Sequence, residues 1–168
     1  MNRVYKDINL KIDINPGHMA LLLSIFASAT YSWTFLDDAT LFPNIEDANQ
    51  QSMAWTKAAL DVLHYSRRIT SGNVEDIQAM IILSDIVRHI EVGSITYRDL
   101  LSTAVTIARG LLLHRVDDHS NPALTAKLPP DSIHAEIGRR IWWDLAATDW
   151  YVFYCNSSAC KADDLSGC

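Results

Sequence analysis

Apolar residues recur at helical spacing along most of the chain, and no segment of useful length alternates polar and apolar residues as a strand does. The segments with helical spacing are residues 16–34, 47–68, 74–91, 95–113 and 132–155. The pattern therefore predicts an all-α fold of about five main helices, arranged as antiparallel hairpins in a bundle or a short solenoid. Residues 1–14 are compatible with a short strand, a linker or a frayed helix.

Residues that commonly cap helices precede four of these segments. They are Asn15 with Pro16, Asn73 with Asp76 three residues on, Ser94 after Gly93, and Asp131 or Ser132. The pair Asn73 and Asp76 resembles a capping box in which Asp replaces the usual Glu.

The last four of these helices each have a predicted buried stripe. The stripes are Met53, Ala54, Leu60, Leu63 and Tyr65; then Ile77, Met80, Ile81, Leu83, Val87 and Ile90; then Leu101, Ala104, Val105, Ala108, Leu111 and Leu112; and finally Ile133, Ile137, Ile141 and Leu145. The third and fourth helices have broad apolar arcs and a short connection, so we expect them to pack as an antiparallel pair.

The composition is that of a folded chain, with 49% hydrophobic and 20% charged residues among 168. We expect an N-terminal segment 1–15, one helical domain over 16–155, and a polar tail over 156–168. The charge-free stretch 19–36 approaches membrane length, but serines and threonines interrupt it, so it predicts a buried helix and no membrane association.

The net charge of −6 opposes direct DNA binding, because phosphate contacts require a basic surface. The three cysteines, Cys155, Cys160 and Cys168, match neither a zinc motif nor a disulfide framework. No secretory signal is recognisable at the start of the chain, so we expect an intracellular protein. We also expect no cofactor in this chain.

The stretch from Glu136 to Leu145 contains two arginines and two tryptophans within one helical turn of each other. Arg139 or Arg140 could stack on Trp142 or Trp143, and Glu136 and Asp144 each lie four residues from Arg140. These side chains either lock the last helix against its neighbours or contact an effector.

Two acidic pairs are candidate metal ligands. Asp117 and Asp118 lie near His114 and His119, and Asp37-Asp38 is half of an aspartate-rich prenyl-diphosphate motif. Neither has the further ligands that such a site needs, so no catalytic or metal-binding residue is predicted. His114 and Arg115 are instead expected to cap the helix that precedes them, where cations are favoured.

Three stretches, in this order, resemble the fungal-specific transcription factor domain, the regulatory region that follows the zinc binuclear cluster in many fungal activators. They are Asn73–Leu83 with Gln78, Ala108–Arg115 with His114 and Arg115, and Glu136–Leu145 with its Arg-Arg-x-Trp-Trp core. The chain departs from the family pattern in two places. Gly138 stands where a third Arg is frequent, and Leu112-Leu113 replaces Gly-Leu.

The resemblance implies a non-enzymatic regulator in the nucleus that responds to protein partners or a small-molecule effector and controls a metabolic or secondary-metabolite gene set. Zinc would enter only through the family's DNA-binding cluster, whose six cysteines are not in this chain. The domain of the family normally continues further, so we expect a truncated domain with an exposed apolar patch, and hence self-association.

Two alternatives remain open. One is a stand-alone helical interaction protein that competes for partners without binding DNA. The other is a small α-helical isoprenoid-binding protein or enzyme that uses Asp37 and Asp38.

Overall fold

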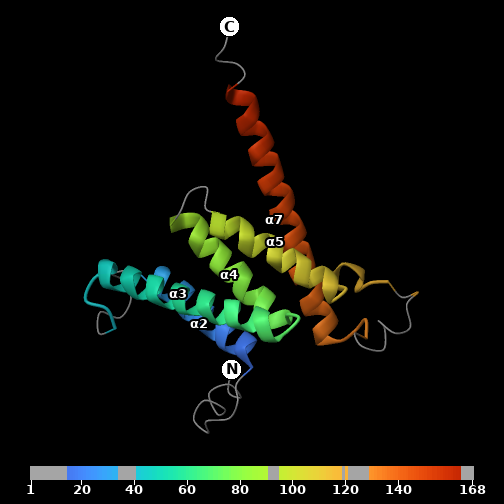
Figure 1. The fold of residues 1–168 in the computed structure, drawn as a ribbon, viewed down its shortest axis with the longest axis horizontal. Coiled ribbons are helices and arrows are strands. Elements are labelled where there is room, and N and C mark those ends of the chain that lie inside the picture. The colour runs from blue at the N-terminus through green and yellow to red at the C-terminus, as the bar shows by residue number, and fades with distance from the viewer. Residues whose placement is uncertain (1–14, 34–40, 91–94, 119, 121–128, 164–168) are drawn as a thin grey trace. The chain divides into compact units, whose positions relative to one another are not determined.

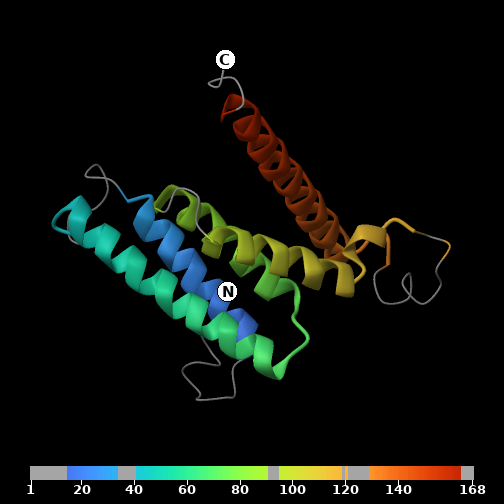
Figure 2. The ribbon, with the colours of Figure 1, turned by 45° about the horizontal axis from the view of Figure 1, so that its top comes forward.

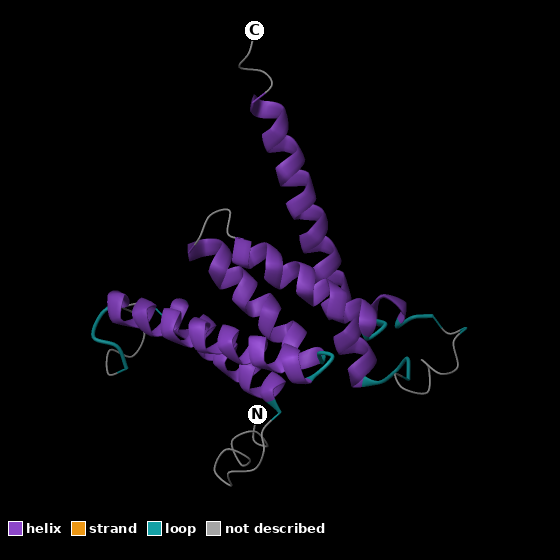
Figure 3. Cartoon of the chain, viewed as in Figure 1, coloured by secondary structure: helices purple, strands orange, loops and turns teal. Residues whose placement is uncertain are grey.

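The computed structural model describes residues 15–33, 41–90, 95–118, 120 and 129–163, with side chains described to Tyr151. Within these ranges every regular element is a helix (Figures 1 and 3), which confirms the all-α prediction. The elements are α2 (Pro16–Tyr31), α3 (Ile45–Ile69), α4 (Val74–Ile90), α5 (Ile95–Gly110), the 3-10 helix η1 (Leu113–Arg115) and α7 (Ile133–Asp163).

The chain forms two compact units, residues 1–107 and 108–168. The first unit contains α2, α3, α4 and most of α5. The second contains the end of α5, η1 and α7. Each unit is described separately below.

In the first unit, α2 lies along α3 (Figures 1 and 2), and small side chains form the contact. The buried positions of α2 are Gly17, Ala20, Leu22, Ser24 and Ala27, and those of α3 are Ala48, Ser52, Thr56, Ala59, Leu63 and Ser66. Small residues let two helix backbones approach closely. At the contact the Ser52 hydroxyl donates a 2.8 Å hydrogen bond to the Ala27 carbonyl.

The predicted buried stripe of α3 was largely wrong. Met53 and Tyr65 are about half exposed, and of the predicted stripe Leu63 is fully buried. The hydrophobic pattern selected mainly large apolar side chains such as Met53 and Tyr65, whereas the contact with α2 uses mostly small ones.

The N-terminal caps of α2 and α4 confirm their sequence signals. Asn15 accepts the Gly17 N–H at 2.9 Å. The capping box of α4 is complete, because Asn73 accepts the Asp76 N–H at 2.8 Å and Asp76 accepts the Asn73 N–H at 3.1 Å. These two ends meet, so α2 and α4 start from the same corner of the unit.

Asp76 is also the centre of a buried polar contact with α3. The Ser66 hydroxyl lies 3.1 and 3.2 Å from its two carboxylate oxygens, and the side chain is 1% exposed. Burial raises the pKa of this carboxyl above its usual value, an effect that the hydrogen bonds from Asn73 and Ser66 oppose.

The buried face of α4 agrees with prediction at Ile77, Met80, Leu83 and Val87, while Ile90 is exposed and Ile86 is buried in its place. Among the described residues α4 packs extensively on α2. The end of α5 lies near the start of α4, because a Cβ atom at Gly72 would lie 2.7 Å from the Ile107 Cγ2, which agrees with the expected antiparallel return of α5. Gly93 and Ser94 lie outside the described residues.

The fourth predicted helix ends three residues early, at Gly110 rather than Leu113. Its predicted buried residues Leu101, Ala104 and Ala108 are confirmed, but Leu112 is 37% exposed. The last helix begins, as predicted, after Ser132, whose hydroxyl accepts the Ala135 N–H at 3.1 Å.

The backbone of α7 continues to Asp163, past the predicted domain end at residue 155. Its buried positions include Ala135, Ile141 and Leu145, whereas the predicted core residue Ile133 is 77% exposed. The buried stripe of α7 thus begins at Ala135 and agrees with the predicted one at Ile141 and Leu145.

Candidate functional site

Within the second unit, η1 packs against the first turns of α7 through a close approach at Gly138. A Cβ atom at Gly138 would lie 3.1 Å from the Leu113 Cδ2, and Leu113 itself is 2% exposed. The glycine that departs from the family pattern therefore accommodates a neighbouring side chain, at the helix-propensity cost of about 1 kcal/mol relative to alanine.

Leu112 has φ 61° and ψ 26°, a left-handed conformation that disfavours residues with a Cβ atom. This is the position at which the family pattern has glycine. This chain therefore holds a leucine in a conformation suited to glycine.

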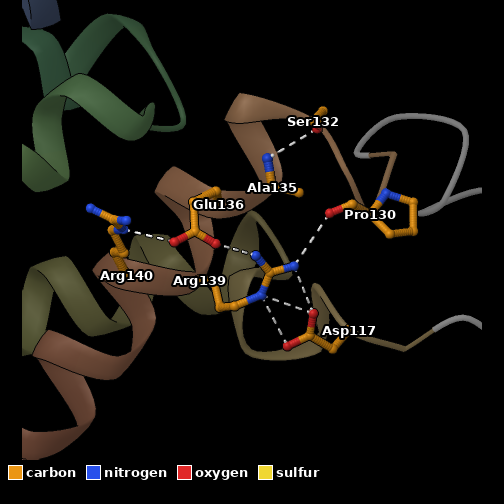
Figure 4. A network of polar contacts seen from close by, with 7 residues as sticks. All are labelled: Asp117, Pro130, Ser132, Ala135, Glu136, Arg139 and Arg140. Atoms are coloured by element: carbon orange, nitrogen blue, oxygen red, sulfur yellow. Dashed lines mark hydrogen bonds and ion pairs between the residues drawn. The ribbon is translucent and has the colours of Figure 1, made fainter.

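Arg139 joins α7 to the segment after η1 (Figure 4). Its Nη2 lies 2.9 Å from Asp117 Oδ1, and its Nε donates to the same oxygen at 3.0 Å. The guanidinium also donates to Glu136 and, at 3.4 Å, to the Pro130 carbonyl. Asp117, followed by Glu136, raises the pKa of Arg139, so this side chain stays charged.

Glu136 lies between the two arginines (Figure 4). Its Oε1 accepts a 2.7 Å hydrogen bond from Arg140 Nε, and its Oε2 accepts from Arg139. Hydrogen bonds from Arg140 and Arg139 lower the pKa of Glu136. The pairing of Glu136 with Arg140 was predicted from their spacing, and it is confirmed.

The prediction that Asp144 is a second carboxylate partner of Arg140 was wrong. Among the described contacts Arg140 pairs with Glu136 and not with Asp144, whose pKa is raised by partial burial. The expected stacking of an arginine on an indole is not found among the described ring contacts, in which Trp142 pairs with His114.

Trp142 instead faces His114, with ring centroids 5.5 Å apart and planes inclined at 53°. His114 belongs to η1, so this pair forms a second link between η1 and α7 besides Arg139 with Asp117. Trp142 is half-buried, whereas the neighbouring Trp143 is 66% exposed.

The prediction that His114 and Arg115 cap the preceding helix was wrong, because that helix ends at Gly110 and both residues belong to η1. Arg115 pairs with Asp118, donating from Nε at 3.1 Å. Hydrogen bonds from Ser120 and Arg115 lower the pKa of Asp118 to about 2.

A hollow of about 430 Å³ opens between these elements of the second unit. It is lined by Leu113, His114, Arg115, Val116, Asp117, Asp118, Arg139, Trp142 and Trp143. Its volume is within the range of small-molecule pockets. Of the residues that carried the family resemblance, five line this hollow: His114, Arg115, Arg139, Trp142 and Trp143. Glu136 pairs with Arg139 of the lining and with Arg140, and Gln78 lies half-buried on α4 in the other unit.

The sequence pattern does not indicate the role of Asp117, because its partner Arg139 lies 22 positions away in the chain. No cluster of three or more His, Cys, Asp or Glu that could hold a metal ion is found within the described ranges. Asp37 and Asp38, the basis of the isoprenoid alternative, lie outside those ranges. No helix in the described part of the chain is long and apolar enough to cross a membrane.

The exposed aromatic residues of α7 bear on the expected self-association. Trp143 and Trp150 are seven residues apart on one helix face, with exposed fractions of 66% and 74%. The self-association itself stays a prediction.

Comparison with known proteins gives three curated relatives. The chain is 43% identical over 154 residues to the probable transcription factor lepB of Aspergillus flavus, covering 90% of this chain and 27% of that protein. It is 30% identical over 162 residues to the agnestins biosynthesis cluster transcription factor AgnL11 of Paecilomyces divaricatus, covering 95% and 23%. Transcription factor TAS2 of Pyricularia oryzae is 28% identical over 140 residues, covering 83% and 18%.

The chain thus spans about a quarter or less of the length of these relatives. No solved structure matches it. The model of the fungal specific transcription factor domain matches residues 4–154, nearly the whole chain and all three stretches that carried the resemblance. The chain belongs to the fungal-specific transcription factor domain family.

Proposed function

We propose that the chain is the regulatory region of a nuclear transcription factor that controls a secondary-metabolite gene cluster. The observation that carries this proposal is the similarity, over 95% of the chain, to a protein named as the transcription factor of a biosynthesis cluster. The more similar relative of Aspergillus flavus is likewise named as a transcription factor. In this proposal the chain has no catalytic role.

The hollow between η1 and α7 is the effector site in this proposal. Its two arginines are each paired with an aspartate, Arg139 with Asp117 and Arg115 with Asp118, so its lining carries no net formal charge when His114 is neutral. A neutral ligand with a flat aromatic face fits such a lining, because it can stack on Trp142 without displacing either ion pair.

Binding there would act through the links between η1 and α7. Arg139 with Asp117 and His114 with Trp142 connect residues 22 and 28 positions apart in the chain. A ligand that contacts Trp142 and His114 favours the arrangement in which both of these residue pairs are in contact. It shifts the balance between arrangements only by the difference between its affinities for them.

DNA reading and zinc binding belong, in this proposal, to the cysteine cluster of the family and not to this chain. The chain's net charge of −6 supports this division of roles. The purified chain should give no mobility shift of duplex DNA at physiological salt. Specific binding in the nanomolar range would contradict the proposal.

A gene deletion tests the regulatory role. Removing the gene that encodes this chain from its host should lower the transcripts of one contiguous set of biosynthetic genes, and restoring the gene should recover them. Unchanged transcripts of all such sets under producing conditions would contradict the role.

Ligand binding tests the effector site independently. Products and intermediates of the affected pathway are titrated into the chain while tryptophan fluorescence and the thermal midpoint are followed. At a ligand concentration of about 100 Kd we expect stabilisation of roughly 2.7 kcal/mol. The shift should be lost in His114→Ala and kept in His134→Ala, an exposed histidine outside the hollow.

A further inference from the structure

The last turn of α3 carries two arginines directly before a hydroxyl residue, in the order Arg67-Arg68-Ile69-Thr70. The pattern of two arginines, any residue and then Ser or Thr occurs once in the chain. The other arginine pair gives Arg139-Arg140-Ile141-Trp142, which matches it except that an indole replaces the hydroxyl. Many protein kinases select acceptor hydroxyls by basic residues two and three positions earlier.

The geometry makes this hydroxyl reachable. Thr70 is the C-terminal cap of α3, with φ −132° and ψ 161°, so its backbone is already extended. Arg67, Arg68 and Thr70 are all exposed, and Ile69 is 55% exposed. Opening this last turn therefore uncovers little apolar surface.

Open space lies next to the hydroxyl. A hollow of about 270 Å³ in the first unit borders Thr70, and its lining also includes Arg67 and, from α5, Ser102 and Thr106. None of the described contacts pairs Arg67 or Arg68 with a carboxylate, so a kinase can engage both arginines without breaking an ion pair.

The Thr70 hydroxyl also belongs to the polar contact between α3 and α4. It donates to the Ser66 carbonyl at 3.0 Å and accepts the Gly72 N–H at 3.2 Å. It lies 3.4 Å from the Ser66 hydroxyl, which contacts the buried carboxylate of Asp76. Thr70 is therefore connected through Ser66 to Asp76, which belongs to the capping box of α4.

We propose that Thr70 is a phosphorylation site for a protein kinase that selects basic substrates, and that the phosphate loosens the junction of α3 and α4. The Thr70 oxygen forms a bond to the γ-phosphorus of ATP as the bond from that phosphorus to the bridging oxygen breaks. The hydroxyl proton passes to the kinase's base, and ADP leaves. This inference concerns the first unit and is independent of the effector site.

Electrostatics sets the direction of the effect. The phosphate adds about two negative charges at the C-terminal end of α3, where the helix dipole disfavours anions. It also lies close to Asp76, whose burial already disfavours a charge. The modified oxygen has no hydrogen to donate to the Ser66 carbonyl.

The full chain tests the proposal with Mg-ATP and the catalytic subunit of cyclic-AMP-dependent protein kinase as probe. We expect about one phosphate per chain, located at Thr70 by mass spectrometry. Thr70→Ala should abolish labelling and Ser71→Ala should leave it unchanged. Arg67→Gln with Arg68→Gln should lower kcat/KM for phosphorylation by about tenfold or more, because the charges that the kinase reads are gone.

The phosphorylated chain should unfold at a thermal midpoint lower by ~5 °C, the scale on which a domain of this size responds to a weakened contact. Phosphatase treatment should restore the midpoint. The proposal is overturned if the chain is not labelled, if Ser71 carries the phosphate, or if phosphorylated and unmodified chains unfold at the same temperature.

Discussion

The side-chain amide of Asn73 donates a hydrogen bond to the side-chain oxygen of Asn15 at 3.3 Å. Each of these residues also caps a helix, Asn15 at α2 and Asn73 at α4. The two caps, 58 positions apart in the chain, therefore support each other at one corner of the first unit.

Gly17 makes this contact possible, and its replacement should disturb it. A Cβ atom at Gly17 would lie 2.6 Å from the Asn73 amide, so Gly17→Ala must displace a side chain that caps α4. We expect a loss of about 1 kcal/mol in the free energy of unfolding, the usual value of a cap. Chemical denaturation measures this loss.

A double-mutant cycle distinguishes this cause from a general effect of the substitution. In the Asn73→Ala background the clash is gone, so Gly17→Ala should then be neutral or stabilising. Equal losses in both backgrounds would show that Asn73 is not the reason.

Asp76 should make the stability of the first unit depend on pH. Burial raises the pKa of Asp76 in the folded state above its unfolded value near 3.8. Below about pH 3.8 the carboxyl is therefore neutral, and its contribution to the stability of the fold is fully present. Its contribution is lost as the pH rises through the raised folded pKa. The unfolding free energy of wild type minus that of Asp76→Asn should therefore fall with increasing pH from about 4 upward. A difference that rises with pH would refute this prediction.

Leu112→Gly should stabilise the second unit, because glycine adopts the left-handed conformation without the Cβ penalty of ~1 kcal/mol. The greater freedom of glycine in the unfolded chain opposes this gain, so we expect a net increase of roughly 0.5 kcal/mol. Leu111→Gly is the matched control, since Leu111 has a negative φ, and it should destabilise. Equal effects at both positions would argue against the explanation.

The neighbouring tryptophans Trp142 and Trp143 of α7 should differ in how much they stabilise the fold. Trp142 is half-buried against His114, so Trp142→Ala should lower the unfolding free energy by about 2–3 kcal/mol, less than a fully buried indole. Trp143 is mostly exposed, and Trp143→Ala should change it by less than about 0.5 kcal/mol. Denaturation curves that shift equally for both variants would be inconsistent with this arrangement.

The helices, and the starts of α2, α4 and α7, could be predicted from the sequence because their signals are local. Asn15, Asn73 and Ser132 each act on an N–H group two or three residues away. The pairing of Glu136 with Arg140 is equally local.

The remaining contacts join distant positions or depend on shape rather than hydrophobicity. Arg139 and Asp117 are 22 positions apart in the chain, and the sequence around each residue does not show that they pair. The α2 and α3 contact uses Ser52 and Ala27, which a hydrophobic pattern ranks below Met53. The left-handed backbone at Leu112 had a signal only in the family pattern, where glycine stands at that position.

The most direct test of the effector site is made in the host organism. Transcripts of the regulated gene set are measured under inducing conditions in strains that carry His114→Ala or His134→Ala in the full-length protein, with protein levels matched. Both histidines are exposed in the second unit, but His114 lines the hollow against Trp142. We predict that His114→Ala lowers induction by about fivefold or more, while His134→Ala leaves it unchanged. Full induction in the His114→Ala strain would contradict the assignment of the hollow as the effector site.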